Sequence, residues 1–481
     1  MAHEPHLRRV LGLGDVVLMI IAGMLNLNTL TPLVAHGSLV LLAWPLTFVV
    51  WLVPQCITVI ELSQHFPGEG AVYVWPTRLL GGMHGFLSGW CYAMANAVYV
   101  PTLIVSSIGL GAFAFMDQHS VIPSDGMAVE MASFGLLALL IGLSIRGMIA
   151  EKWLVNLAAI GTLLAGGLLI ALAGWLIQHG SSAMQPLRLR PEQVDRHMLS
   201  AFSLTCYALL GFEIASNVGD EIRDPRRTLR RAVFIGAIVT ASMYFILTLS
   251  TLITLPAGNE ALVAGLMPAI AAVLERAGFS AWVPAIAALV ALSVAGAAAA
   301  WIASPARIPY MASLDGYLPR IFGRLHRRYQ TPHVALLGTG LLCAFALWMS
   351  FAGASLNEAF LTILDLAVIL SLAQYLYMYS SLLSLVFRHR HIKTMFRRRT
   401  LIIAGIGGLM TTLFATGFAF VPSREVEHVW MFESKLWGAC LLMLGAGVVS
   451  FRMSAARRAT LANPGSGEGE NESVVKVTAP E

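Results

Sequence analysis

One carboxylate, Glu213, lies in an apolar stretch where its chemistry needs an explanation. The stretch FSLTCYALLGFEIASNVGDEIRDPRRTLRR (202–231) begins as a membrane-spanning run and is interrupted at Gly211, Phe212 and Glu213. A carboxylate in a span is costly unless it faces a cavity or a partner, and a glycine lets the helix open there. Non-helical backbone at that depth is tolerated only where it lines protein or water. We therefore predict a broken transmembrane helix at a binding site; the alternative is a kinked helix in which Glu213 serves packing.

A second interruption is predicted in the first apolar run, at residues 22–30 (AGMLNLNTL). Gly23 offers a place to unwind, and Asn26 and Asn28 carry amides that need partners inside a bilayer. Interrupted helices at corresponding positions of two halves are typical of transporters built from inverted repeats. A plain first helix with interhelical amide contacts is the alternative.

The substrate site is therefore expected at residues 22–28 and 207–213. Tyr207 or Phe212 would cover the substrate, and Glu213 would be the proton or amine site because burial disfavours a charged carboxylate. Backbone groups that would meet the substrate belong to Ala22, Gly23, Met24, Leu210 and Gly211. Further candidates are Asn26, Asn28, Asn96 and Asp365. For Asn96 an interhelical hydrogen bond is an equal alternative, and for Asp365 a helix cap or a salt bridge is.

The composition indicates a polytopic helical membrane protein. Of the 481 residues, 57% are hydrophobic and 12% are charged, whereas soluble domains carry about 25% charged residues. Charge-free windows long enough to cross a hydrocarbon core include 39–60, 153–177, 232–258, 277–303 and 400–422. The alternation that a membrane β-barrel needs is absent. The five cysteines all fall in apolar runs without metal-ligand spacing, so we expect neither a disulfide framework nor a metal site.

Twelve spans are predicted, and their loops allow a charge test. The spans are 11–35, 39–62, 84–116, 127–145, 153–178, 198–220, 230–255, 281–311, 333–353, 356–387, 400–421 and 434–451. Most of the 31 Lys and Arg residues fall in loops on the side of the N-terminus, which places both termini in the cytoplasm. The expected fold is all-α integral membrane, with an inverted 5+5 repeat and two C-terminal helices.

The predicted organisation has five parts. They are a cytoplasmic N-terminus (1–10), a first five-helix repeat (11–178), a second, inverted repeat (198–387), helices eleven and twelve (400–451) and a disordered cytoplasmic tail (452–481). Outer segments are expected at 179–197, which is polar, and at 256–280, as a lid or helical hairpin.

Three motifs resemble the amino acid–polyamine–organocation (APC) superfamily, over roughly residues 10–450. The stretch after the eighth span matches that superfamily's cytoplasmic segment through Arg307, Tyr310, Met311, Ala312, Asp315, Gly316, Leu318, Pro319, Phe322, Thr331 and Pro332. The stretch 202–231 matches through Gly211, Phe212, Glu213, Glu221, Pro225, Arg226 and Arg231. The loop after the second span matches through Pro67, Gly68, Gly70, Tyr73, Gly85, Gly89 and Trp90.

The resemblance implies a secondary transporter, or permease, of the plasma membrane. Members move amino acids or related amines by alternating access, coupled to protons or by exchange. Two departures stand out: the usual glycine-rich motif of the first helix is replaced by 22–30, and the predicted fifth span, 153–178, holds no lysine. A polyamine- or amine-specific transporter and a transport-inactive amine sensor are therefore the alternatives.

Other function classes are disfavoured. A membrane enzyme would need a catalytic motif such as His-Glu-x-x-His or Gly-x-Ser-x-Gly, and none occurs. A channel usually needs a ring of like sites or a re-entrant filter. Dispersed basic loops argue against nucleic acid, so the expected partners are a small-molecule substrate, protons and membrane lipid, with no cofactor.

Overall fold

The computed structural model describes residues 7–34, 37–115, 126–180, 196–254, 267–351, 356–420 and 429–454. The predicted segments 179–197, 256–280 and 452–481 lie wholly or partly outside these residues. The side chains of residues 356–365, at the start of the fifteenth helix, are not described either, and they include that of Asp365.

The described chain is helical, and its long helices match the predicted spans. Eleven helical segments among the described residues are long and apolar enough to cross a membrane. The principal helices are α1 (Leu13–Met24), α2 (Leu30–Val34), α3 (Val40–Thr47), α4 (Val53–His65), α5 (Ala71–Leu79), α6 (Gly82–Phe115), α7 (Gly126–Arg146), α8 (Met148–Gln178), α9 (Arg196–Ala208), α10 (Phe212–Asn217), α11 (Pro225–Thr254), α12 (Met267–Arg276), α13 (Val283–Leu314), α14 (His333–Phe351), α15 (Leu356–Phe387), α16 (Arg398–Ala419) and α17 (Val429–Met453). The predicted sixth span is the interrupted pair α9 and α10, which is not among the eleven. The all-helical membrane fold is confirmed, while the count of twelve stays a prediction.

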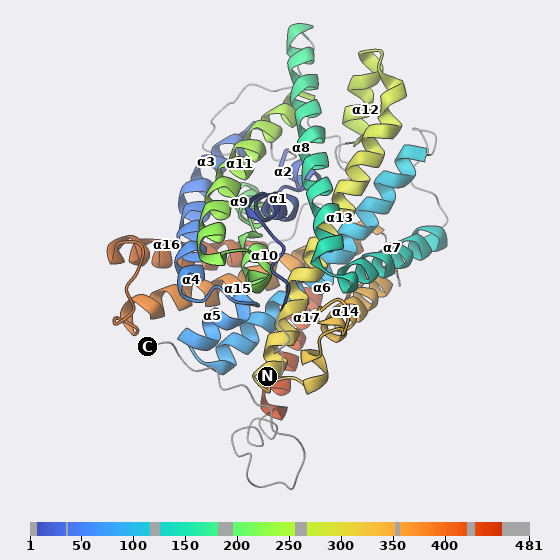
Figure 1. Cartoon of the computed structure of the whole chain (residues 1–481). Helices are drawn as coiled ribbons and strands as arrows, with labels where there is room; N and C mark the ends of the chain where they lie inside the picture. The colour runs from blue at the N-terminus through green and yellow to red at the C-terminus, as the bar shows by residue number, and fades with distance from the viewer. Residues whose placement is uncertain are drawn as a thin grey trace, which may run out of the picture.

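Helix α1 lies at the centre of the bundle. It packs against α8, α11 and α13, which surround it in Figure 1. Its second half is almost wholly buried, from Met19 to Met24. On the outer helices, large apolar side chains such as Leu341 and Ile403 are exposed. This arrangement suits a bundle in lipid, because apolar side chains on its periphery face hydrocarbon.

Helix α8 begins earlier than predicted. Gly147 adopts a φ of 103° immediately before the helix, and α8 starts at Met148. A positive φ of this kind favours glycine and separates one helix from the next. Lys152 therefore belongs to α8, and the expectation of no lysine in the fifth span was wrong. Its ammonium lies 3.4 Å from the carboxylate of Asp15, at the start of α1.

Candidate functional site

Both predicted helix breaks are present. Helix α1 ends at Met24, and Leu25 and Asn26 are extended before a short 3₁₀ turn at Leu27–Thr29. Helix α9 ends at Ala208, and α10 starts at Phe212 after Gly211, whose φ is 136°. Only glycine adopts such a backbone without strain.

The two breaks lie against each other through their glycines. A Cβ added at Gly23 would overlap the Cδ1 atom of Ile214 in α10. A Cβ added at Gly211 would stand 2.7 Å from the Cγ atom of Met24. Each break therefore needs a glycine to admit a side chain of the other.

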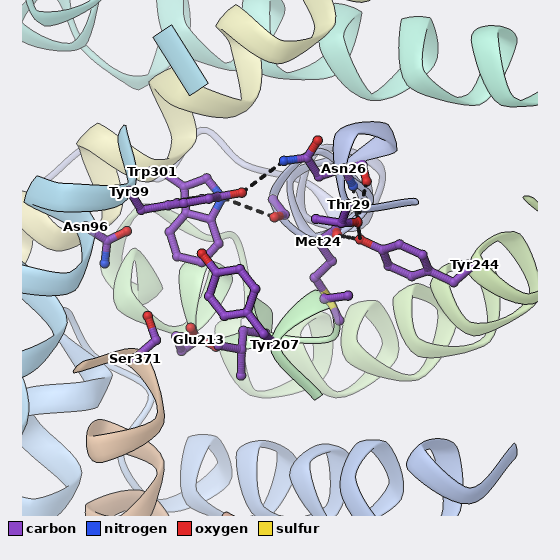
Figure 2. A pocket seen from close by; sticks show the side chains of 13 residues that line it. Met24, Asn26, Thr29, Asn96, Tyr99, Tyr207, Glu213, Tyr244, Trp301 and Ser371 are labelled. Carbon is purple, nitrogen blue, oxygen red and sulfur yellow. Dashed lines mark hydrogen bonds between the residues drawn. The ribbon is translucent and has the colours of Figure 1, made fainter. Parts of the chain in front are cut away.

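A small pocket lies between the breaks and the helices α6, α11, α13 and α15. Its lining residues are Gly23, Met24, Asn26, Thr29, Asn96, Tyr99, Tyr207, Ala208, Leu210, Glu213, Tyr244, Trp301 and Ser371. Figure 2 shows Glu213 and Ser371 on one side of it, with Tyr99 and Trp301 on the opposite side. The cavity of about 20 Å³ has room for little more than one water molecule. The structure thus presents a contracted site.

Three aromatic side chains form one wall. Tyr99 contacts both Tyr207 and Trp301 edge to face, with ring centroids 5.9 Å and 5.6 Å apart. The indole of Trp301 donates to the carbonyl of Gly23 at 3.1 Å. Asn26 donates from its side chain to the Tyr99 hydroxyl at 3.1 Å. These contacts tie the aromatic wall to the break in α1 (Figure 2).

Most backbone N–H groups at the break in α1 already have acceptors. The amide of Leu25 donates to Ile21, and the amide of Asn26 contacts both the Met24 carbonyl and the Tyr244 hydroxyl. The amides of Asn28 and Thr29 donate to the side chain and the carbonyl of Asn26, respectively. A substrate carboxylate would have to displace these acceptors before it could bind there.

Glu213 is the acidic group of the pocket. It is 1% exposed, and among the described residues that line the pocket it is the only acidic or basic one. One carboxylate oxygen accepts from the Gly211 amide at 3.1 Å and from the Tyr375 hydroxyl at 2.5 Å. The other accepts from the Gln374 amide at 3.3 Å. The carboxylate is thereby fixed at the edge of the pocket, where it can attract a cation.

Beyond the pocket, at the end of the bundle that carries the arginine-rich loops, several segments pack together. Arg307 donates to both carboxylate oxygens of Glu221, at 2.9 Å and 3.0 Å. The amide of Gly70 donates to the Asn217 carbonyl at 2.9 Å. A Cβ at Gly219 would overlap the carbonyl oxygen of Pro67. Residues 66–70 and 217–221 therefore meet backbone to backbone, which leaves no room for a side chain between them.

The sequence matches one family model over almost its whole length. The model described as "Amino acid permease" covers residues 11–446. The chain belongs to the amino acid permease family. The resemblance to the APC superfamily is thereby confirmed.

Relatives of this permease include transporters of several kinds. It is 24% identical to an uncharacterized transporter of Legionella pneumophila over 460 residues, which cover 91% of this chain and 96% of that protein. It is 24% identical over 340 residues to a probable agmatine/putrescine antiporter of Lactococcus lactis, covering 69% and 70% of the two chains. A glutamate/gamma-aminobutyrate antiporter of the same organism is 23% identical over 394 residues, covering 78% and 76%.

The permease structure places most of the predicted site residues around the pocket. Those that line it are Gly23, Met24, Asn26, Asn96, Tyr207, Leu210 and Glu213. Ala22, Asn28, Gly211 and Phe212 belong to the two breaks but do not line it, and Phe212 is fully buried. Asp365 belongs to α15, but its side chain is outside the described part of the chain.

Ala208 also lines the pocket and falls in the predicted segment 207–213, whereas five lining residues were not predicted: Thr29, Tyr99, Tyr244, Trp301 and Ser371. Tyr244 lies in the middle of α11, where its hydroxyl donates to the Met24 carbonyl at 2.6 Å. A usable sequence signal exists for Trp301, which follows the small-residue run AGAAAA at 295–300. Small residues let helices approach closely, so a large ring beside them must fill a gap.

Proposed function

We propose that this permease is a secondary transporter of amino acids or related organic amines in the cytoplasmic membrane. It would work by alternating access, coupled to protons or by exchange. The arginine-rich end of the bundle would face the cytoplasm, together with both termini, because basic loops stay on that side.

The observation that carries this proposal is the buried carboxylate of Glu213 in a pocket between two broken helices. Opposite charge attracts an ammonium group strongly in a low-dielectric site, and the described lining holds no cation that would compete. The aromatic wall adds a favourable surface, since the faces of Tyr and Trp rings attract cations. Asp365 would supply a second acidic group.

Within this class, amines without an α-carboxylate fit the pocket better than amino acids do. The N–H groups at the break in α1, from Leu25 to Thr29, are engaged within the protein, apart from that of Leu27. A carboxylate would also meet the like charge of Glu213 across a small cavity. The name of the agmatine/putrescine antiporter among the relatives is compatible with this preference, whereas that of the glutamate/gamma-aminobutyrate antiporter represents the alternative.

Transport would require two movements. The pocket must widen for a substrate, so the aromatic wall of Tyr99, Tyr207 and Trp301 would have to move. The packed segments at the arginine-rich end must then separate to release the substrate. Glu213 is the candidate for a proton that moves with the substrate, in which case Glu213→Gln abolishes pH-dependent uptake.

Ligand stabilisation of the purified permease tests the substrate class. A ligand that binds only the folded state raises its apparent melting temperature. The panel pairs amines with the amino acids that contain them, for example agmatine with arginine and putrescine with ornithine. We expect the decarboxylated member of each pair to stabilise more. Stabilisation by amino acids alone would overturn the preference for amines.

The same ligands are then tested for flux in liposomes. Uptake that depends on an opposing gradient of the same amine indicates exchange, and uptake driven by an imposed pH gradient indicates proton coupling. Binding without flux in either format would favour an amine sensor over a transporter.

A further inference from the structure

Glu151 is a buried carboxyl group that the substrate pocket does not use. It lies in the first turn of α8, shortly after Gly147. It is 1% exposed, and neither of its oxygens has a hydrogen-bond partner among the described residues. The buried Ser144 hydroxyl is the side-chain donor close to it, but the two groups do not meet in hydrogen-bond geometry. An unpaired ionised carboxylate in such surroundings is strongly unfavourable.

The charged groups around Glu151 do not compensate it. Arg307, on α13, attracts it, and Glu221 repels it. The guanidinium of Arg307 is already engaged by both oxygens of Glu221, and its Nε atom lies 3.8 Å from Glu69. Lys152 is next in sequence, but its ammonium pairs with Asp15.

Other titratable groups nearby lie at the margin of this cluster or belong to adjoining segments. Asp220 is exposed and donates its amide to Glu69. Arg146, at the end of α7, is exposed as well. His333 starts α14, and its Nδ1 atom has no partner among the described residues. Tyr310 interacts with Glu69 and Asp220.

The charges therefore do not balance when every acid is ionised. Arg307 faces the three carboxylates of Glu69, Glu151 and Glu221. Burial, and then Glu221, raise the pKa of Glu69 well above its usual range. Even with Glu69 neutral, Glu151 and Glu221 would share a single guanidinium. Since Glu221 holds both of its bonds to Arg307, the remaining proton belongs on Glu151, whose oxygens form no hydrogen bond among the described residues.

We propose that Glu151 is a proton-binding site of the closed arginine-rich end. It is neutral while residues 66–70 and 217–221 and α13 pack together, and it ionises when that end opens and water reaches it. Acid on that side of the membrane therefore favours the closed end, and a rise in pH favours opening. The inference rests on the proposed function insofar as opening of this end is the cytoplasmic phase of transport.

Thiol labelling beneath the closed end tests the site without any substrate. Ser216, on α10, is buried and lies 3.3 Å from the Ser63 hydroxyl, so Ser216→Cys is a nearly isosteric reporter. The rate of N-ethylmaleimide modification at position 216 is measured by peptide mass spectrometry from pH 5.5 to 8. The same rate is measured in a second protein that carries both Ser216→Cys and Glu151→Gln. Dividing the first rate by the second removes the pH dependence of the thiol reaction itself.

The expected result concerns the ratio of the two rates. At low pH the protein with Glu151 labels as slowly as the E151Q protein. As pH rises, its rate relative to E151Q increases, by up to about tenfold per pH unit for one linked proton. Glu151→Asp retains this dependence, which separates titration from a packing role. If E151Q does not fold, the labelling rate of the same cysteine in the urea-unfolded protein serves as the reference. Glu275→Gln, which removes an exposed carboxylate from α12, leaves the ratio unchanged.

Four results would overturn the proposal. The first is a rate ratio that does not change with pH, and the second is a ratio that follows sodium concentration in place of pH. The third is a pH dependence that Glu69→Gln removes while E151Q still shows it, which would assign the proton to Glu69. The fourth is the absence of labelling at every pH. Since no substrate is added, each of these results leaves the amine-binding proposal standing. Conversely, a failed ligand panel does not affect this assay.

Discussion

Replacement of Glu213 by glutamine is the sharpest test of how the pocket selects its substrate. Glutamine is nearly isosteric, and its carbonyl oxygen can still accept from the Gly211 amide and the Tyr375 hydroxyl, which both reach one carboxylate oxygen. The fold should therefore persist while the charge is lost. Truncating one partner of a buried charge pair costs about 2–5 kcal/mol. That range corresponds to an increase of about 30- to 4,000-fold in the Kd for an amine.

Calorimetric titration of the purified E213Q protein with the best amine of the panel measures this loss. Because the introduced glutamine offers only a neutral acceptor, the binding enthalpy should fall together with the affinity. Glu275→Gln is the matched control, since Glu275 is exposed and far from the pocket in sequence. An E213Q protein that binds the amine within about threefold of the parent Kd, which is less than 1 kcal/mol, would refute the assignment of Glu213 as the ammonium partner.

Three further predictions concern the supports of the site, each read from the apparent melting temperature in detergent. Gly211→Ala places a side chain on a backbone with φ of 136° and 2.7 Å from the Met24 Cγ atom, so stability falls by about 1–3 kcal/mol; an unchanged melting temperature would contradict the strain argument. Tyr244→Phe removes the 2.6 Å hydrogen bond to the Met24 carbonyl, with an expected loss of about 1–2 kcal/mol, and wild-type stability would show that the break in α1 does not need it. Arg307→Met leaves the buried Glu221 without its partner, for a loss of about 3–5 kcal/mol; addition of Glu221→Gln should restore most of it, and failure to do so would disprove the pairing.

The helix breaks could be located from the sequence because they violate the composition of a membrane span. A glycine close to a carboxylate, as at Gly211 and Glu213, is unfavourable in a helix that faces lipid, because the carboxylate needs a cavity or a partner. Gly23 followed by two asparagines carries a similar signal. These features are local, so one sequence is enough to find them.

The aromatic wall could not be located in this way. Tyr99 and Tyr244 stand in long apolar helices, where a tyrosine can face the cavity, another helix or the membrane interface. The choice depends on how each helix is rotated about its axis, and neighbouring helices decide that rotation by packing. The start of α8 was missed for a related reason: Lys152 looks like loop composition, but Asp15 across the helix pair compensates its charge.

The contracted pocket has a consequence for how affinity and turnover relate. If the resting protein encloses little more than one water, only a minor, expanded population can accept a substrate, and the apparent affinity is reduced by that population. Substitutions that shrink the aromatic wall, such as Trp301→Phe, would enlarge this population and tighten binding. The same substitutions would stabilise the loaded protein in the state that first accepts the substrate, so it would change sides more slowly. In this permease, weak substrate binding would then accompany a high rate of transport.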